Sequence, residues 1–180
     1  NESFNELINY KYRVALPAPA LYGQFNNLEN VDYVLTGLKK MGFDDVVEVS
    51  KGAEYISSAT RMMMETGSLK KPVISTACPA VVRLIRTRFP NLITNLLPLC
   101  APIDVAAGIA RKRAIAATGL KSEEIGIFFI SPCPAKRTAV KSPLCHESEI
   151  DGAFAIKDLY PVLVQTMDKL RVEELESIND

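Results

Sequence analysis

The sequence predicts an α/β fold in which a parallel sheet of about four strands is flanked by helices. Short runs rich in Val, Ile and Phe alternate with longer segments whose apolar residues recur at helical spacing. Such alternation is typical of strands that are joined by right-handed helical crossovers. Three glycines, Gly42, Gly67 and Gly119, follow helical segments at the position of a left-handed C-terminal cap, which supports the same assignment.

The expected elements follow one another without a break in composition, so we expect one domain over residues 1–180. Each expected strand is a short apolar run, and each expected helix but the last ends at a glycine or ahead of a proline. We place strands at 13–18, 45–49, 72–76 and 125–131, helices at 28–41, 51–66, 79–88, 102–118 and 157–172, and a short apolar piece at 152–156.

Composition narrows the class of protein. The chain has 180 residues, 48% apolar and 23% charged, which is enough to bury the core of one globular domain. The chain has 21 Lys and Arg residues and 21 Asp and Glu residues, so its formal net charge is zero. No overall electrostatic field therefore directs the protein to nucleic acid or to an acidic membrane surface. No uncharged apolar run reaches about 18 residues, and no secretory signal opens the chain. We expect a cytoplasmic protein without membrane or nucleic-acid partners.

Two of the four cysteines have similar surroundings. Cys78 and Cys133 each follow an apolar run and small residues, and each precedes Pro-Ala, in ISTACPAVV and FFISPCPAKR. We expect both to lie at the carboxyl ends of strands, where open parallel sheets bind ligands. The sequence therefore predicts two thiols at one crevice, although an isolated cysteine in such a place can also be a small buried filler.

The proline after each cysteine suits the first position of a helix, which puts Cys78 at an N-cap. The positive end of a helix favours a thiolate there, and Lys136 and Arg137 favour one at Cys133. A thiolate attacks electrophiles or binds metal. A Cys-Pro step also recurs where cysteines hold iron–sulfur clusters.

Both segments resemble motifs of the iron-iron (FeFe) hydrogenase large subunit. STACPAVV resembles its first cluster motif, usually TSCCPxW, and SPCPAK resembles its second, MPCxxKxxE. VALPAPALYGQF and GLKKMGFDDVVEVSKGAEY also resemble the family's first strand and the helix and strand after it. The resemblance covers nearly the whole chain in order. It implies one α/β lobe of the family's C-terminal domain, which carries the H-cluster.

The resemblance also implies roles for three residues. Cys78 and Cys133 match thiolate ligands of the family's 4Fe-4S cubane. Lys136 matches the lysine that holds a cyanide of the diiron subsite in active enzymes.

Several positions depart from the family pattern. Ala77 stands where the family has a cysteine that passes protons, and Ala139 stands where the second motif has a glutamate, so we expect no catalytic residue. The third motif, with two more cysteine ligands, has no counterpart, and the chain opens without Met. We therefore expect a fragment of a longer chain that is metal-free by itself, because two thiolates do not complete a cubane that takes four.

These losses favour a noncatalytic iron–sulfur-binding domain with a redox or hydrogen-sensing role in a larger signal-transduction protein. Similar degenerate domains of anaerobic bacteria are joined to ferredoxin-like and PAS sensor modules. We expect such modules as partners of this domain in the same parent chain. We also expect a missing second lobe that supplies two further Cys ligands. Two alternatives stay open: part of an active hydrogenase that transfers electrons to protons, and a thiol redox enzyme whose nucleophile is Cys133. A nucleotide-binding module is disfavoured, since no GxGxxG or GxxxxGK follows a strand.

The remaining candidate residues have plainer interpretations. Cys100 and Cys145 could complete a four-cysteine site, but Cys100 fits a core position and Cys145 a polar loop. His146 could bind a metal with Cys145 or lie in solvent. We expect Arg111 on a solvated helix face and Asp151 in a turn.

Overall fold

The sheet has four parallel strands in the order β2-β1-β3-β4. The computed structural model describes residues 4–26, 28, 30–141 and 149–175. Its first and third strands are central, and six residue pairs run in register from Tyr12 opposite Ile125 to Pro17 opposite Ile130. The strands are β1 (Tyr12–Pro17), β2 (Asp45–Val46), β3 (Ile125–Ser131) and β4 (Gly152–Ala155).

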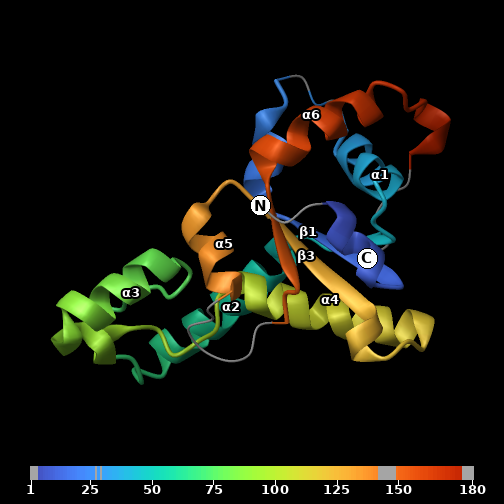
Figure 1. The fold of residues 1–180 in the computed structure, drawn as a ribbon. Coiled ribbons are helices and arrows are strands. Elements are labelled where there is room, and N and C mark those ends of the chain that lie inside the picture. The colour runs from blue at the N-terminus through green and yellow to red at the C-terminus, as the bar shows by residue number, and fades with distance from the viewer. Residues whose placement is uncertain (1–3, 27, 29, 142–148, 176–180) are drawn as a thin grey trace.

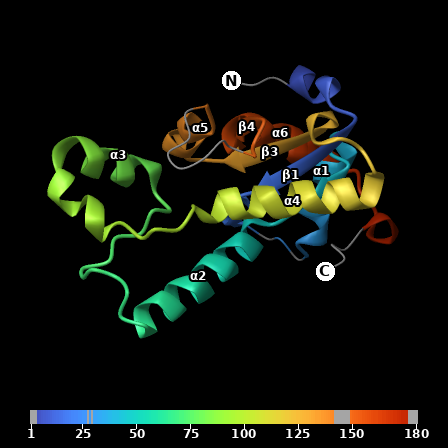
Figure 2. The same cartoon turned by 90° about the horizontal axis from the view of Figure 1, so that it is seen from below.

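Helices cover both faces of this sheet (Figures 1 and 2). Helices α1 and α6 pack on one face, and α4, with the start of α2, packs on the other. The α-helices are α1 (Asp32–Lys40), α2 (Val49–Glu65), α3 (Pro79–Arg88), α4 (Pro102–Thr118), α5 (Pro134–Lys141) and α6 (Ile156–Met167). Short 3-10 helices are η1 (Phe4–Asn9), η2 (Pro19–Gln24), η3 (Pro90–Asn95), η4 (Ser122–Glu124) and η5 (Val172–Glu174).

Strand β3 is buried along its whole length because each of its faces meets a helical layer. Its alternate side chains belong to different cores: Ile127 and Phe129 pack in the α4 core, whereas Phe128 and Ile130 pack in the α1–α6 core. Successive side chains of a strand point to opposite faces of the sheet, and here both faces are buried. It explains why β3 is a continuous apolar run rather than an alternating one.

The predicted strand count is confirmed, but one predicted member is wrong. Residues 72–76 do not join the sheet; they make a single parallel bridge, Ile74 with Leu96. Val73 and Ile74 in this segment are only partly buried, unlike the residues of β3. The fourth strand is instead β4, which the sequence indicated only as an apolar piece at 152–156.

The helix predictions were accurate where a proline or glycine marked the end. Helices α3 and α4 have the predicted bounds, and Gly42, Gly67 and Gly119 all have positive φ, the backbone conformation that favours glycine. Strand β2 is shorter than the predicted 45–49, because α2 begins at Val49. Helix α5 was not predicted.

Residues 53–100 form an arm that extends away from the sheet (Figure 2). It contains most of α2, all of α3 and η3. Several large apolar side chains on it are exposed, including Tyr55 (64%), Met62 (67%) and Met64 (52%) on α2 and Leu84 (51%) on α3. An apolar surface of this kind is typical of a site where another part of a protein packs.

A buried arginine ties α4 to the ends of β3 and β4. Arg111 donates hydrogen bonds to the carbonyl oxygens of Ser122 and Ile125 and forms an ion pair with Asp151 at 2.7 Å. Asp151 also accepts a bond from the N–H of Ile127. The expected solvated face is therefore wrong for Arg111, which is buried and donates to backbone carbonyls, and the expected turn is wrong for Asp151, which directly precedes β4.

Helices α2 and α4 approach each other at Gly52. A Cβ atom there would collide with the carbonyl oxygen of Pro102 and lie 3.0 Å from the backbone nitrogen of Ala106. Neither atom belongs to a flexible side chain, so the helix pair requires glycine at this position. Gly108 on α4 is different, because a Cβ there would meet nothing within 4 Å.

We predict that Gly52→Ala and Gly108→Ala change stability in opposite directions. Gly52→Ala should lower the free energy of unfolding by about 1–3 kcal/mol through overpacking against the α4 backbone. Gly108→Ala should raise it by about 0.5–1 kcal/mol, because alanine favours a helix. Urea unfolding followed by circular dichroism measures both, and equal effects of the two substitutions would contradict the close α2–α4 contact.

Candidate functional site

Cys133 lies where the sequence predicts, at the carboxyl edge of the sheet. Strand β3 ends at Ser131 and α5 begins at Pro134, so the cysteine occupies the turn between them. The Ser131 hydroxyl accepts a hydrogen bond from the Cys133 N–H at 3.2 Å. The Cys133 carbonyl accepts one from the Arg137 N–H at 3.2 Å, as the residue before a helix does. These bonds fix the backbone that carries the half-buried thiol.

Cys78 is the N-cap of α3, which confirms that prediction. Its carbonyl accepts a hydrogen bond from the Val82 N–H at 3.1 Å, and upstream the Ser75 hydroxyl accepts one from the Ala77 N–H at 3.3 Å. The local pattern therefore resembles that at Cys133: a serine bonds the turn, and a helix starts with proline. The Cys78 residue is exposed.

The prediction that Cys78 lies at a strand end of the sheet is wrong. The segment before it belongs to the arm, where Ile74 exchanges backbone hydrogen bonds with Asn95 and Leu97 rather than with a sheet strand. The structure relates the two cysteines in another way. Helices α3 and α5, which start at Cys78 and Cys133, contact each other (Figure 1).

Three further predicted positions lie on or next to these two helices: Ala77 just before α3, and Lys136 and Ala139 on α5. Lys136 is in the first turn of α5 and is half-buried. Ala77 and Ala139 are half-buried too, and a methyl side chain at either position offers neither a proton donor nor an acceptor.

Cys100 is half-buried ahead of α4. Its neighbour Leu99 accepts a hydrogen bond from the Thr76 hydroxyl at 2.8 Å, so this stretch runs beside the approach to Cys78. Among the described residues no group of three or more His, Cys, Asp and Glu side chains is arranged to hold a metal ion. Cys145 and His146 lie outside the described residues.

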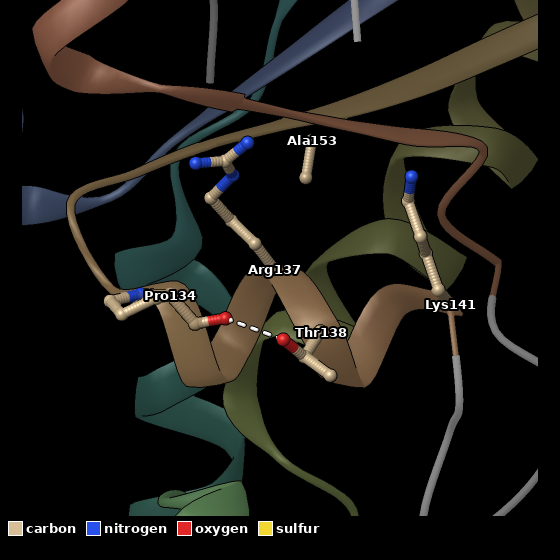
Figure 3. A pocket seen from close by; sticks show the side chains of 5 residues that line it. All are labelled: Pro134, Arg137, Thr138, Lys141 and Ala153. Carbon is tan, nitrogen blue, oxygen red and sulfur yellow. Dashed lines mark hydrogen bonds between the residues drawn. The ribbon is translucent and has the colours of Figure 1, made fainter. Parts of the chain in front are cut away.

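A pocket that was not predicted from the sequence lies beside α5. It has a volume of about 330 Å³ and is lined by Pro134, Arg137, Thr138, Lys141 and Ala153 (Figure 3). The four α5 residues stand at i, i+3, i+4 and i+7, which places them on one face of the helix. The spacing of these residues in PAKRTAVK could have indicated a shared helix face, but only if the segment had been known to be helical.

Tyr22 and Glu48 form a second feature that the sequence did not indicate. Tyr22 is in η2 after β1, and Glu48 follows β2, so both lie past the carboxyl ends of neighbouring strands. Burial of the hydroxyl, followed by the nearby Glu48 carboxylate, raises the pKa of Tyr22 far above its ordinary value. Tyr22 is therefore a neutral phenol at any physiological pH.

Comparison with known proteins identifies the family. A family model described as the iron only hydrogenase large subunit, C-terminal domain, matches residues 11–178. The chain belongs to this family. Its four-stranded parallel sheet with flanking helices is the fold of the FeFe-hydrogenase domain: a variant of HydA1 from Chlamydomonas reinhardtii superposes with a TM-score of 0.74 at 17% identity.

Two curated relatives carry hydrogenase names. Iron hydrogenase 1 of Clostridium pasteurianum is 20% identical in an alignment of 162 residues that covers 83% of this chain and 28% of that protein. The NADP-reducing hydrogenase subunit HndD of Solidesulfovibrio fructosivorans is 21% identical in an alignment of 115 residues that covers 59% of this chain and 20% of that protein. The HydA1 match covers 93% of this chain and 48% of HydA1. The chain thus spans less than half of each relative.

Members of the hydrogenase family normally bind iron–sulfur clusters, and one related structure concerns assembly of the H-cluster. The side chains near the starts of α3 and α5 fit such a cluster in kind, since Cys78 and Cys133 are thiols at helix N-termini and neither is in a disulfide. They do not fit in number, because a cubane takes four ligands. None of the described helices is long and apolar enough to cross a bilayer.

Proposed function

We propose that this chain is a hydrogenase-like iron–sulfur-binding domain that does not turn over hydrogen and serves as a redox or hydrogen sensor. The observation that carries the proposal is the contact between α3 and α5, two helices that each begin at a cysteine followed by proline. Chemically matched thiols on touching helices are what a shared inorganic cluster needs.

In this proposal Cys78 and Cys133 supply two of the four ligands of a 4Fe-4S cluster. The remaining two come from polypeptide outside these 180 residues, which agrees with the small share of each relative that the chain spans. When bound, such a cluster stores and passes single electrons. The isolated chain lacks two of the four ligands and is metal-free.

The protein groups around the two cysteines suit an anionic cluster. Each helix start presents backbone N–H groups and the positive end of its dipole to the thiolate. Lys136, in the first turn of α5, adds a positive charge near Cys133. These groups stabilise negative charge without adding further ligands.

The proposal of lost catalysis rests on Ala77 and Ala139. Both replace residues that the family motifs fill with proton-carrying side chains, Cys and Glu. A methyl group at either place moves no proton, so proton delivery to a substrate site would need another route.

The arm fits the proposed partner, a second lobe with two further cysteine ligands. Apolar side chains such as Met62, Met64 and Leu84 are exposed on it, and Cys78 starts α3 within it. A lobe that packs over this surface would bring its ligands to the same helix. We also propose ferredoxin-like and PAS modules in the same parent chain, a signalling role and a cytoplasmic location; these points rest on analogy with degenerate members of the family.

Anaerobic reconstitution of the full-length protein with iron and sulfide tests the ligands. We predict that Cys78→Ser and Cys133→Ser each lower the iron content by about four atoms per chain, because either loss removes a cubane ligand. Cys100→Ser is the matched control and should leave the iron content unchanged. Full iron content in both the Cys78 and Cys133 variants would show that these thiols are not ligands.

Hydrogen evolution with reduced viologen tests the lack of turnover. We predict that the reconstituted full-length protein evolves no hydrogen above the protein-free blank, because Ala77 carries no proton. Its electron paramagnetic resonance spectrum should nevertheless change under hydrogen or dithionite. Turnover well above the blank would favour the alternative, an active hydrogenase. A spectrum that neither reagent changes would exclude the sensing role.

A further inference from the structure

The two segments that lead to Cys78 and Cys100 run side by side in the arm. They are joined at one parallel bridge. In this bridge the Ile74 N–H donates to the Asn95 carbonyl and the Leu97 N–H donates to the Ile74 carbonyl, both at 2.8 Å. Residues far apart in the sequence are thereby held next to each other before either cysteine is reached.

The register of this bridge places the two cysteines at matching positions. Ile74 pairs with Leu96, and both segments run in the same direction, so equal steps along them lead to opposite positions. Cys78 is four residues past Ile74, and Cys100 is four residues past Leu96. The register therefore aligns one thiol with the other.

A side-chain hydrogen bond keeps the segments together beyond the bridge. The Thr76 hydroxyl donates to the Leu99 carbonyl at 2.8 Å, two residues before Cys78 and one residue before Cys100. Hydrogen-bonded neighbouring segments lie about 4.8 Å apart. The Cα atoms of a disulfide are usually about 4.4–6.8 Å apart. The spacing of the two segments thus suits a disulfide.

The two thiols are suited to different steps of a thiol–disulfide exchange. Neither is in a disulfide in this structure. Cys78 is exposed at the N-cap of α3, so a small oxidant reaches it, whereas Cys100 is half-buried behind it. Cys100 has an interaction of its own, but a thiol is only a weak hydrogen-bond donor and acceptor, so exchange displaces such a contact.

We propose that Cys78 and Cys100 form a reversible disulfide in the cluster-free protein, with a small disulfide such as glutathione disulfide as the oxidant. The Cys78 thiolate attacks one sulfur of the oxidant, breaks its S–S bond and releases one glutathione. The Cys100 thiolate then attacks the Cys78 sulfur of the mixed disulfide and releases the second glutathione. The protein loses two electrons and two protons, and the oxidant takes up both to become two thiols.

The disulfide and the cluster exclude each other, a consequence that rests on the proposed function. A Cys78 sulfur in a disulfide is not a thiolate and does not bind iron. Conversely, a Cys78 thiolate that ligates a cluster does not attack the oxidant. The pair is therefore a redox switch on cluster loading: oxidation closes the ligand position, and a thiol reductant opens it again.

Peptide mass spectrometry of the full-length, iron-free protein tests the pairing. The protein is incubated with glutathione disulfide, its remaining thiols are alkylated, and it is digested with trypsin. We expect the peptide of residues 71–83, which contains Cys78, to be linked to the peptide of residues 89–111, which contains Cys100. Dithiothreitol should remove the link. Linkage of Cys78 to another cysteine, or Cys78 left alkylated or joined only to glutathione, would overturn the proposal.

Variants test the geometry behind the pairing. Cys78→Ser and Cys100→Ser should each abolish the link, and Cys133→Ser, the matched control, should keep it. Thr76→Val conserves the shape of the side chain but removes the bond to Leu99, so it should slow formation of the link about fivefold, the effect of one lost hydrogen bond. A link that forms equally fast without this hydroxyl would contradict the proposed alignment.

The same measurement on protein loaded with iron and sulfide separates the disulfide from the proposed function. We expect no link in the loaded protein, because Cys78 is then a ligand. Equal linkage with and without the cluster would support the disulfide and contradict ligation by Cys78. Absence of the link from both forms would overturn the disulfide and leave the proposed ligand role standing.

Discussion

Burial of β3 on both faces is the constraint on which the rest of the structure depends. Because its odd and even side chains serve two cores, the strand cannot shift by one residue without exchanging them. Phe128 packs edge-to-face with Tyr10 and Phe43, and the Arg111–Asp151 pair holds the start of the strand to α4 and β4. Because the position of β3 is fixed in this way, the position of Cys133, which follows the end of the strand, is fixed at the sheet edge.

Much of this fold could be read from the sequence, since local signals and tertiary structure agree. The run IGIFFIS predicts a buried strand, and Pro79, Pro102 and Gly119 mark helix ends that the structure keeps. The wrong strand predictions arise where burial in the fold, rather than the local sequence pattern, determines whether a segment joins the sheet. PVIST has the composition of a strand but makes only one bridge and stays partly exposed. GAFA is short and contains Gly152, yet it pairs with β3 along its whole length.

The local structure at the two cysteines was predictable in part, but the way in which they are related in space was not. The Cys-Pro step at Cys78 predicts the start of α3, whereas the start of α5 after Cys133 was not predicted. Their relation does not follow from the strand-end rule, because only Cys133 ends a sheet strand. It comes from contact between α3 and α5, which depends on how the arm folds back, and no local signal encodes that. The α5 pocket stayed hidden for the same reason: its spacing has meaning only on a helix.

In the proposed function, Cys78 and Cys133 hold one cluster between α3 and α5. Anomalous diffraction at the iron absorption edge, from crystals of the anaerobically reconstituted full-length protein, tests it most directly. We expect one iron–sulfur cluster whose iron atoms are bonded to the Sγ atoms of both cysteines. Iron bound elsewhere, with these two thiols in separate environments and no metal between them, would contradict it.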